Sequence, residues 1–159
     1  MTEIDTAKAV VAAHLEGLDR SSPGEALKAH FARTHTPDHQ YRGMRPFYDL
    51  TGPEAVAETV WAPLKAAVTT LQRRPDLMIA SRDHLRAEGA PWVVNMGHLL
   101  ADMTGDWLGI PAPNRTVFLP YATLFRVEGD RIAETVEFLD ILSVLTQLGR
   151  NPYTDHQTG

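Results

Sequence analysis

Three residues in the C-terminal half carry side chains suited to acid–base chemistry: Asp140, Tyr121 and His98. Asp140 follows Val136 and Phe138 at a spacing of two, which puts its carboxylate on a strongly apolar face of the strand predicted at 131–142. Burial disfavours the charged form and raises the pKa of a carboxyl toward neutrality, where a general acid or base works. We therefore predict that Asp140 moves protons. Its alternative role is to cap a backbone end or to lie in solvent beyond the sheet.

The turn in the segment VEGDRI places Tyr121 near Asp140. Gly129-Asp130 lies between two alternating runs and predicts a two-residue hairpin turn, which pairs Glu128 with Arg131. Counting outward from this pair makes Tyr121 a diagonal neighbour of Asp140, at roughly 7–8 Å between backbones. Its hydroxyl could then stabilise an oxyanion beside the proton carrier. A proline immediately before Tyr121 would alter this pairing if the strand bulges there.

His98 is the third candidate, in the strand predicted at 92–104. Asp102 shares its strand face, but four residues of strand separate their backbones by roughly 13 Å, too far for a hydrogen-bonded pair. Whether His98 reaches the side of Asp140 depends on pairing across the loop at 105–114, because a slip of one residue reverses the face. His98 is therefore either a catalytic or ligand-contacting residue or a half-buried structural histidine.

Other kinds of site find little support. His35 and His39 have the spacing of helical metal ligands, but Pro37 between them argues against a helix. The chain contains no cysteine, glycine-rich phosphate loop or serine nucleophile motif. We therefore expect neither a metal ion nor a cofactor.

Composition narrows the class of protein further. The 159 residues are 43% hydrophobic and 22% charged, with a formal net charge of −5 and no basic run. This pattern does not favour nucleic acid or anionic lipid as a partner. The acidic N-terminal segment differs from a signal peptide, and no apolar run is long enough to span a bilayer. We expect a soluble, cytoplasmic protein.

The elements that would position these residues are helices first and strands afterwards, which predicts an α+β fold. We expect one domain at 1–150 and a polar tail at 151–159. Helices are predicted at 6–18, from a start signal at 22–25, and from a second start signal at 51–54 with a kink at Pro63. The segment 35–50 is interpreted as a loop with at most one short strand. Strands are predicted at 77–84, 92–104, 116–128 and 131–142.

Several aromatic side chains would suit an apolar ligand pocket, although most aromatics in a domain of this size belong to the core. The predicted pocket residues are Trp61, Trp107, Phe138, Tyr41 and Phe47. Trp107 is the least expected of them, because it lies in TGDWLGIPAPNR, a segment otherwise rich in turn formers.

That segment, followed by LFRVEGDRIAETVEFLDILSVLTQLG, resembles the SnoaL-like polyketide cyclases of the nuclear transport factor two-like superfamily. The matching features are a G-x-x-x-G-I-P loop, a strand ending in arginine-valine-glutamate, a glycine turn, and an aspartate before a leucine-glycine segment. In this chain they correspond to Gly105–Pro111, Arg126–Glu128, Gly129, Asp140 and Leu148–Gly149. The segment TGPEAVAETVWAPLKAAV resembles the third helix of the family more loosely.

The resemblance implies a cone-shaped fold in which N-terminal helices pack on a curved antiparallel sheet around an apolar pocket. It implies that Asp140 is the acid and base of an aldol ring closure, and that Trp107 lines the rim or a dimer contact. It also implies a homodimer formed through the sheet. The histidine that partners the aspartate in the cyclases is missing at 124–126, so His98 or Tyr121 takes its place or the aldol chemistry is absent.

These residues and the resemblance lead to three candidate functions. The first is a cofactor-free, polyketide cyclase- or isomerase-like enzyme that moves a proton next to a carbonyl of an apolar or aromatic small molecule. The second is a non-catalytic protein that binds such a molecule in the same cavity. The third is an epoxide hydrolase with an aspartate-arginine-aspartate set, which we rank last because Arg126 points away from the face of Asp140.

Overall fold

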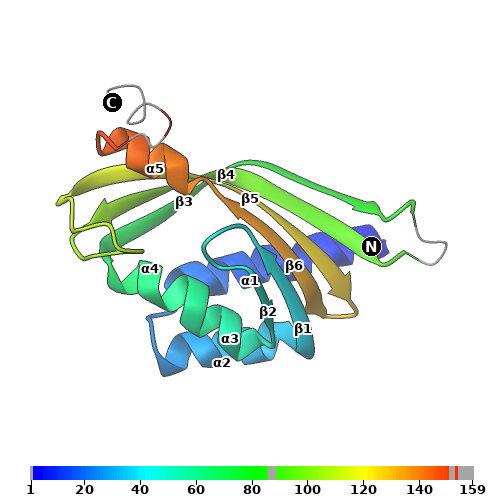
Figure 1. Ribbon diagram of the computed structural model, residues 1–159. Helices are drawn as coiled ribbons and strands as arrows, with labels where there is room; N and C mark the ends of the chain where they lie inside the picture. Colours follow the sequence, from blue (N-terminus) through cyan, green and yellow to red (C-terminus); the bar gives the residue numbers. More distant parts are fainter. Residues whose placement is uncertain (1, 86–88, 151–152, 154–159) are drawn as a thin grey trace.

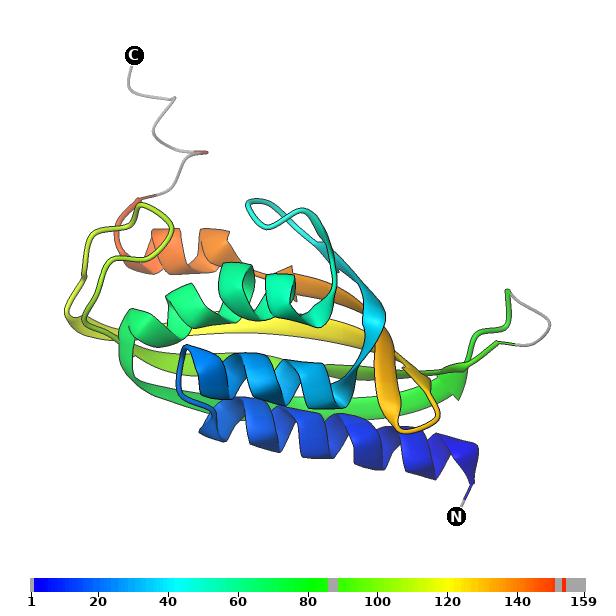
Figure 2. The ribbon, with the colours of Figure 1, turned by 90° about the horizontal axis from the view of Figure 1, so that it is seen from below.

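A curved six-stranded sheet with helices on its concave face forms the molecule (Figures 1 and 2). The computed structural model describes residues 2–85, 89–150 and 153. The strands are β1 (His35–Gly43), β2 (Asp49–Thr51), β3 (Val68–Arg82), β4 (Pro91–Met103), β5 (Arg115–Glu128) and β6 (Arg131–Leu139), in the spatial order β2-β1-β6-β5-β4-β3. The predicted α+β class is confirmed. Apart from Tyr153, the tail predicted at 151–159 lies outside the described residues.

The helices are α1 (Glu3–Arg20), α2 (Glu25–Thr34), α3 (Pro53–Val56), the π-helical turn η1 (Ala57–Trp61), α4 (Ala62–Ala66) and α5 (Ile141–Gln147). Figure 2 shows α1, α2 and the α3–α4 segment side by side across one face of the sheet. We call this face of the sheet the inner face and the opposite one the outer face. In the described part of the chain, no helix is long and apolar enough to cross a membrane.

α1 begins earlier than its apolar spacing predicts because Thr2 and Asp5 form a capping box. Its buried side includes Val11, Leu15 and Leu18 and packs on β3 and β4. The two start signals predicted the positions of α2, which begins at Glu25, and α3, which begins at Pro53, but neither helix has the expected side-chain cap. Where a kink near Pro63 was expected, the π-helical turn η1 separates α3 from α4, and Pro63 lies in the first turn of α4.

The segment predicted as a loop at 35–50 is instead a strand pair, β1 and β2. β1 lies parallel to β6, so the sheet is not entirely antiparallel as expected. The buried positions of β1 are His35, His39 and Tyr41. Polar and aromatic side chains at those positions hide the alternation that normally marks a half-buried strand.

The hairpin of β5 and β6 confirms the predicted turn but not the register beyond it. Glu128 pairs with Arg131 as expected. A bulge then adds Ala133 to β6, so that Tyr121 faces Leu139 instead of the predicted Phe138. Because side chains alternate along a strand, this slip of one residue moves every later side chain of β6 to the opposite face.

The apolar residues of the 104–114 loop are explained by packing. Trp107 and Ile110 exchange backbone hydrogen bonds of 3.0 and 2.8 Å across a tight turn at Leu108 and Gly109, both of which have positive φ. Trp107 and Ile110 are buried in the main core cluster, whereas Leu108 is exposed. The loop therefore closes the end of the sheet near α4 and α5 (Figure 1).

Candidate active site

A row of polar side chains crosses the inner face of the three central strands. Asn95 of β4 pairs with Thr123 of β5, and Thr123 pairs with Glu137 of β6, so all three point to the same side. Each of the three residues is at most 4% exposed. A carboxyl group on a buried sheet face is costly unless it is hydrogen-bonded, which makes Glu137 the residue whose presence needs an explanation.

Glu137 accepts two hydrogen bonds from buried hydroxyl groups. The Tyr41 hydroxyl donates to Oε2 at 2.9 Å, and the Thr123 hydroxyl donates to Oε1 at 3.2 Å. Burial raises the pKa of Glu137, and the two hydrogen bonds together with the positive charge of Arg73 oppose that rise. Burial and the neighbouring Glu137 carboxyl also raise the pKa of Tyr41. A carboxyl whose pKa is raised beside a neutral phenol is an arrangement suited to proton transfer near neutral pH.

A glycine makes room for the ring of Tyr41. A Cβ atom at Gly43, two residues along β1, would lie 2.6 Å from Cε1 and 3.1 Å from the hydroxyl oxygen of Tyr41. No side chain can occupy that space while the ring is in place. Gly43 therefore lets the ring lie over its own strand and reach Glu137 on the neighbouring strand.

A small internal cavity of about 10 Å³ lies beside Glu137. Its walls come from α1, α2, β1, the α3–η1 segment, β5 and β6 and include Tyr41, Trp61, Thr135, His14 and His35. Trp61 ends the π-helical turn η1, and such turns occur often at functional sites. The cavity has room for about one water molecule, far below the roughly 300 Å³ at which ligand pockets begin.

Tyr121 is buried on the inner face, but its hydroxyl is directed to a different partner from the one expected. It donates to Oδ1 of Asn95 at 2.8 Å. The guanidinium of Arg73 lies 5.0 Å from the centre of the Tyr121 ring and 5.6 Å from that of Trp61. Asp19 holds this guanidinium through Nε and Nη2 at 2.9–3.1 Å. Tyr121 therefore belongs to a cation–aromatic group next to the polar row.

The structure corrects the placement of Asp140. This residue is exposed and caps α5, its Oδ1 accepting a hydrogen bond of 2.9 Å from the backbone N–H of Ser143. The bulge in β6 pairs Thr123 with Glu137 instead of the predicted Val136, and the strand ends at Leu139, one residue before Asp140. Asp140 therefore has the capping role stated as its alternative, and together with Tyr121 and Phe138 it borders an open depression of about 410 Å³.

His98 and Phe138 lie on the outer face, and neither borders the internal cavity. His98 is half-buried, with its ring 5.7 Å from the ring of Phe118, and its role stays a prediction. Phe138 is 43% exposed because the bulge turned it outward. Among the remaining predicted pocket residues, Tyr41 and Trp61 line the cavity, whereas Phe47 and Trp107 are core residues away from it.

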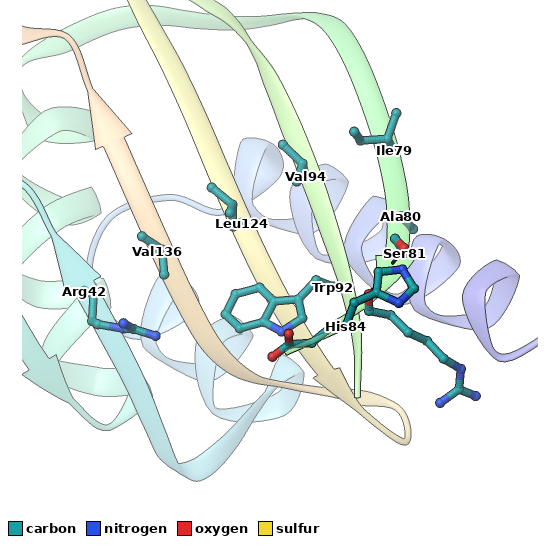
Figure 3. Close-up of a pocket in the computed structure, with 11 residues that line it drawn as sticks. Arg42, Ile79, Ala80, Ser81, His84, Trp92, Val94, Leu124 and Val136 are labelled. Atoms are coloured by element: carbon teal, nitrogen blue, oxygen red, sulfur yellow. Dashed lines mark hydrogen bonds between the residues drawn. The ribbon is translucent and has the colours of Figure 1, made fainter. Parts of the chain in front are cut away.

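The outer face carries an open depression with a volume of about 500 Å³ (Figure 3). Its floor is a row of register partners from four neighbouring strands: Val136, Leu124, Val94 and Ile79. Trp92 and His84 border it at one end and Arg42 at the side. Arg42 and Arg126 both pair with Glu134. The volume is that of a ligand pocket, but the depression is open and holds no buried carboxyl.

Sequence reasoning missed Glu137, although one signal was available. Glu134 and Glu137 lie three residues apart in the run AETVEF, so a regular strand would put them on opposite faces. Both are nevertheless buried, Glu134 at 7% and Glu137 at 4% exposure. Two carboxyls at odd spacing in an apolar run indicate that one of them enters the core. Within the described ranges, no group of three or more histidine or acidic residues has the arrangement of a metal site.

Comparisons with known proteins agree with this fold. Residues 23–148 match the sequence profile of the SnoaL-like polyketide cyclase family. A candidate SnoaL-like polyketide cyclase from Jannaschia sp. CCS1 has 22% identity and a TM-score of 0.68, with 92% of this chain and 93% of that chain covered. AclR of Streptomyces galilaeus, described as a candidate hydroxylase, has 15% identity and a TM-score of 0.71, with 94% and 99% covered.

A third solved structure is IdmH of Streptomyces antibioticus, described as a candidate polyketide cyclase, with 17% identity, a TM-score of 0.64, and 87% and 97% covered. Curated protein sequences gave no significant match. Identities this low establish the fold alone, whereas the profile match spans most of the 159 residues. On the strength of that match, the chain belongs to the SnoaL-like polyketide cyclase family.

Proposed function

We propose that this protein is an acid–base enzyme of the cyclase or isomerase type, in which Glu137 moves a proton at a carbon next to a carbonyl of an apolar substrate. One observation carries the proposal: a fully buried carboxyl, hydrogen-bonded to Tyr41 and Thr123, lies beside the internal cavity. Membership of the SnoaL-like polyketide cyclase family supports this class of reaction.

The proposed chemistry begins when the ionised Glu137 takes a proton from the carbon next to the substrate carbonyl. The electron pair of that C–H bond becomes an enolate, whose oxygen is stabilised by the Tyr41 hydroxyl turning from Glu137 to the substrate. In a cyclisation the enolate carbon then attacks a second carbonyl, and Glu137 returns its proton to the new alkoxide. In an isomerisation the proton returns to a different carbon. Glu137 is ionised again at the end of either sequence.

Substrate entry requires the cavity to enlarge, because about 10 Å³ holds no substrate. Trp61 and Tyr41 form part of its wall and come from different segments, η1 and β1. We propose that these two rings move apart when a substrate binds. A π-helical turn interrupts the regular hydrogen bonds of the α-helix around it, and such turns occur often at functional sites. We therefore place this movement at η1.

The test is exchange of carbon-bound hydrogen with solvent deuterium in a panel of small apolar and aromatic ketones and diketones. The wild-type protein should catalyse exchange of the proton next to the carbonyl, and Glu137→Gln should slow it by roughly 100- to 10,000-fold. Asp140→Asn is the matched control, because it removes an exposed carboxylate and should leave exchange unchanged. Equal exchange in the wild type and Glu137→Gln would contradict the proposal.

A second candidate function, non-catalytic binding of an apolar molecule, is favoured by the 500 Å³ depression of the outer face. Trp92→Ala would then abolish binding of the panel compounds while Glu137→Gln leaves it intact.

We also propose that the outer face mediates a homodimer, supported by apolar side chains that are 40–52% exposed on neighbouring strands: Leu77, Ile79, Met96, Phe118 and Phe138. A dimer formed in this way would cover the depression, so this dimer and binding of an apolar molecule in the depression are alternatives.

A further inference from the structure

Four histidines are buried together between the helices and the sheet, and we call them the histidine cluster: His14, His30, His35 and His39. Each is at most 3% exposed. His14 lies on α1, His30 on α2, and the other two on β1. Their rings form a continuous series, with centre-to-centre distances of 5.1 Å from His30 to His14, 4.7 Å from His14 to His35, and 4.5 Å from His35 to His39.

Hydrogen bonds fix the proton positions in the first two rings. Arg33 donates from Nη2 to Nδ1 of His30 at 3.1 Å, so the neutral ring of His30 carries its proton on Nε2. That Nε2–H donates to Nδ1 of His14 at 3.1 Å and to its backbone carbonyl at 3.0 Å. Protonation of His30 at Nδ1 or of His14 at Nδ1 would therefore remove an acceptor and set two donors against each other.

The same geometry argues against a proton wire. Nδ1 of His14 lies 3.2 Å from the Thr34 hydroxyl as well as 3.1 Å from His30, so both neighbours use one nitrogen of that ring. A relay would need one nitrogen to receive the proton and the other to pass it on. Nδ1 of His35 donates to the Phe31 carbonyl at 3.2 Å and lies 2.9 Å from the same threonine hydroxyl. The cluster is therefore a fixed, neutral structure.

The helix surface is shaped to accept the cluster. A Cβ atom at Gly17 would lie 2.3 Å from Cε1 of His30, so glycine leaves the notch on α1 into which this ring fits. A glycine inside a helix costs roughly 0.5–1 kcal/mol relative to alanine. Gly17 therefore lowers the intrinsic helix stability of α1 but allows α1 and α2 to lie in close contact through His30.

The charges around the histidine cluster are mainly positive. The charges of Arg33 and Lys65 act on His30, that of Arg73 on His14, and that of Arg126 on His39. Arg73 is paired with Asp19, and Arg126 is paired with Glu134. The carboxyls on the other side are Asp38, near His39, and Glu137, which borders the same cavity as His14 and His35. Burial lowers the pKa of all four histidines, that of His39 to about 4.

We propose that the histidine cluster is an acid-responsive latch: while neutral it holds α1 and α2 against β1 and the sheet, and proton uptake releases this helical layer from the cavity beside Glu137. The direction follows from linkage. Because the folded pKa values lie below the ordinary value of 6.5, the folded and unfolded chains are both neutral at the cluster above about pH 7.5. Below pH 6.5 the unfolded or released form takes up protons before the folded form does, so stability falls as pH falls toward the folded pKa values.

The experiment measures the free energy of unfolding in urea between pH 8 and pH 4.5 by tryptophan fluorescence. The slope of the logarithm of the unfolding constant against pH counts the protons taken up on unfolding. His30→Gln keeps the donor toward His14 but cannot titrate, and it should lower this count below pH 6.5, because burial lowers the pKa of His30. His39→Gln, where the side-chain nitrogen can still reach Thr135, should do the same. The count is independent of any change in stability at pH 8.

His98→Gln is the matched control, because His98 lies on the outer face outside the cluster. Its effect is the reference against which the two cluster variants are compared. Backbone hydrogen exchange at pH 5.5 and pH 7.5 then tests the release: exchange corrected for the intrinsic rate should rise in α1 and α2 more than in β4 and β5. An unchanged proton count in both His30→Gln and His39→Gln would overturn the latch. Equal increases in exchange across helices and strands would overturn the selective release of the helical layer.

Discussion

Glu137→Gln has a predicted effect on stability that needs no knowledge of the substrate. Glutamine has the shape of the protonated glutamate, and its amide can donate to the Thr123 hydroxyl, which then accepts instead of donating. The substitution removes the ionisation and retains the contact with Tyr41. At low pH, where both side chains are neutral, the two proteins should differ by only about 1 kcal/mol, the usual net effect of altering one hydrogen bond.

The difference between them should then grow with pH. Burial raises the folded pKa of Glu137 above its ordinary value of 4.5, so the folded protein keeps a proton that the unfolded chain has released. Within the window between these two pKa values, the free energy of unfolding of the wild type falls by up to about 1.4 kcal/mol per pH unit relative to Glu137→Gln. Above the folded pKa the difference becomes constant. The free energy of unfolding of Glu137→Gln should therefore rise relative to that of the wild type as pH rises from 5 to 8.

Urea unfolding followed by tryptophan fluorescence at pH 5, 6, 7 and 8 measures this difference. The histidine cluster is present in both proteins, so its contribution cancels in the comparison. Asp140→Asn provides the control, since it removes an exposed capping carboxylate instead of a buried one. A constant difference for Glu137→Gln would refute the reasoning that burial controls the ionisation of Glu137.

Three further outcomes are expected. Asp19→Asn should lower the free energy of unfolding by about 2–3 kcal/mol, because it leaves the buried guanidinium of Arg73 with a neutral partner. Glu16→Gln, which removes the exposed ion pair with Arg20, is the control and should lower it by less than about 0.5 kcal/mol. Gly17→Ala should destabilise by about 1–2 kcal/mol in thermal or urea unfolding despite the better helix propensity of alanine, and an unchanged stability would show that His30 can move aside. Phe118→Glu should convert the proposed dimer into monomer in analytical ultracentrifugation, whereas Tyr48→Glu, which alters an exposed aromatic on the β1–β2 loop, should not; a monomeric wild type would refute the dimer.

Local patterns were sufficient to predict much of the fold. The apolar spacing of Val11, Leu15 and Leu18 predicted the buried side of α1, and Gly129-Asp130 predicted the turn between β5 and β6. Both rest on interactions between residues close in sequence, where periodicity and turn preferences are direct physical signals. The family resemblance extended these local predictions to the SnoaL-like fold, which the profile match confirms.

The candidate site depended on contacts that no local pattern contains. One extra residue in β6, Ala133, put Glu137 on the inner face, Asp140 lies beyond the strand as the cap of α5, and the parallel pairing of β1 with β6 brought Tyr41 to the carboxyl from 96 residues away. The sequence by itself determined α1, the positions of β4, β5 and β6 and the turn between the last two strands, but not β1, β2 or α5. Tertiary structure decided which carboxyl is buried, because strand faces alternate at every residue and the face beyond a bulge is selected by packing across the whole sheet.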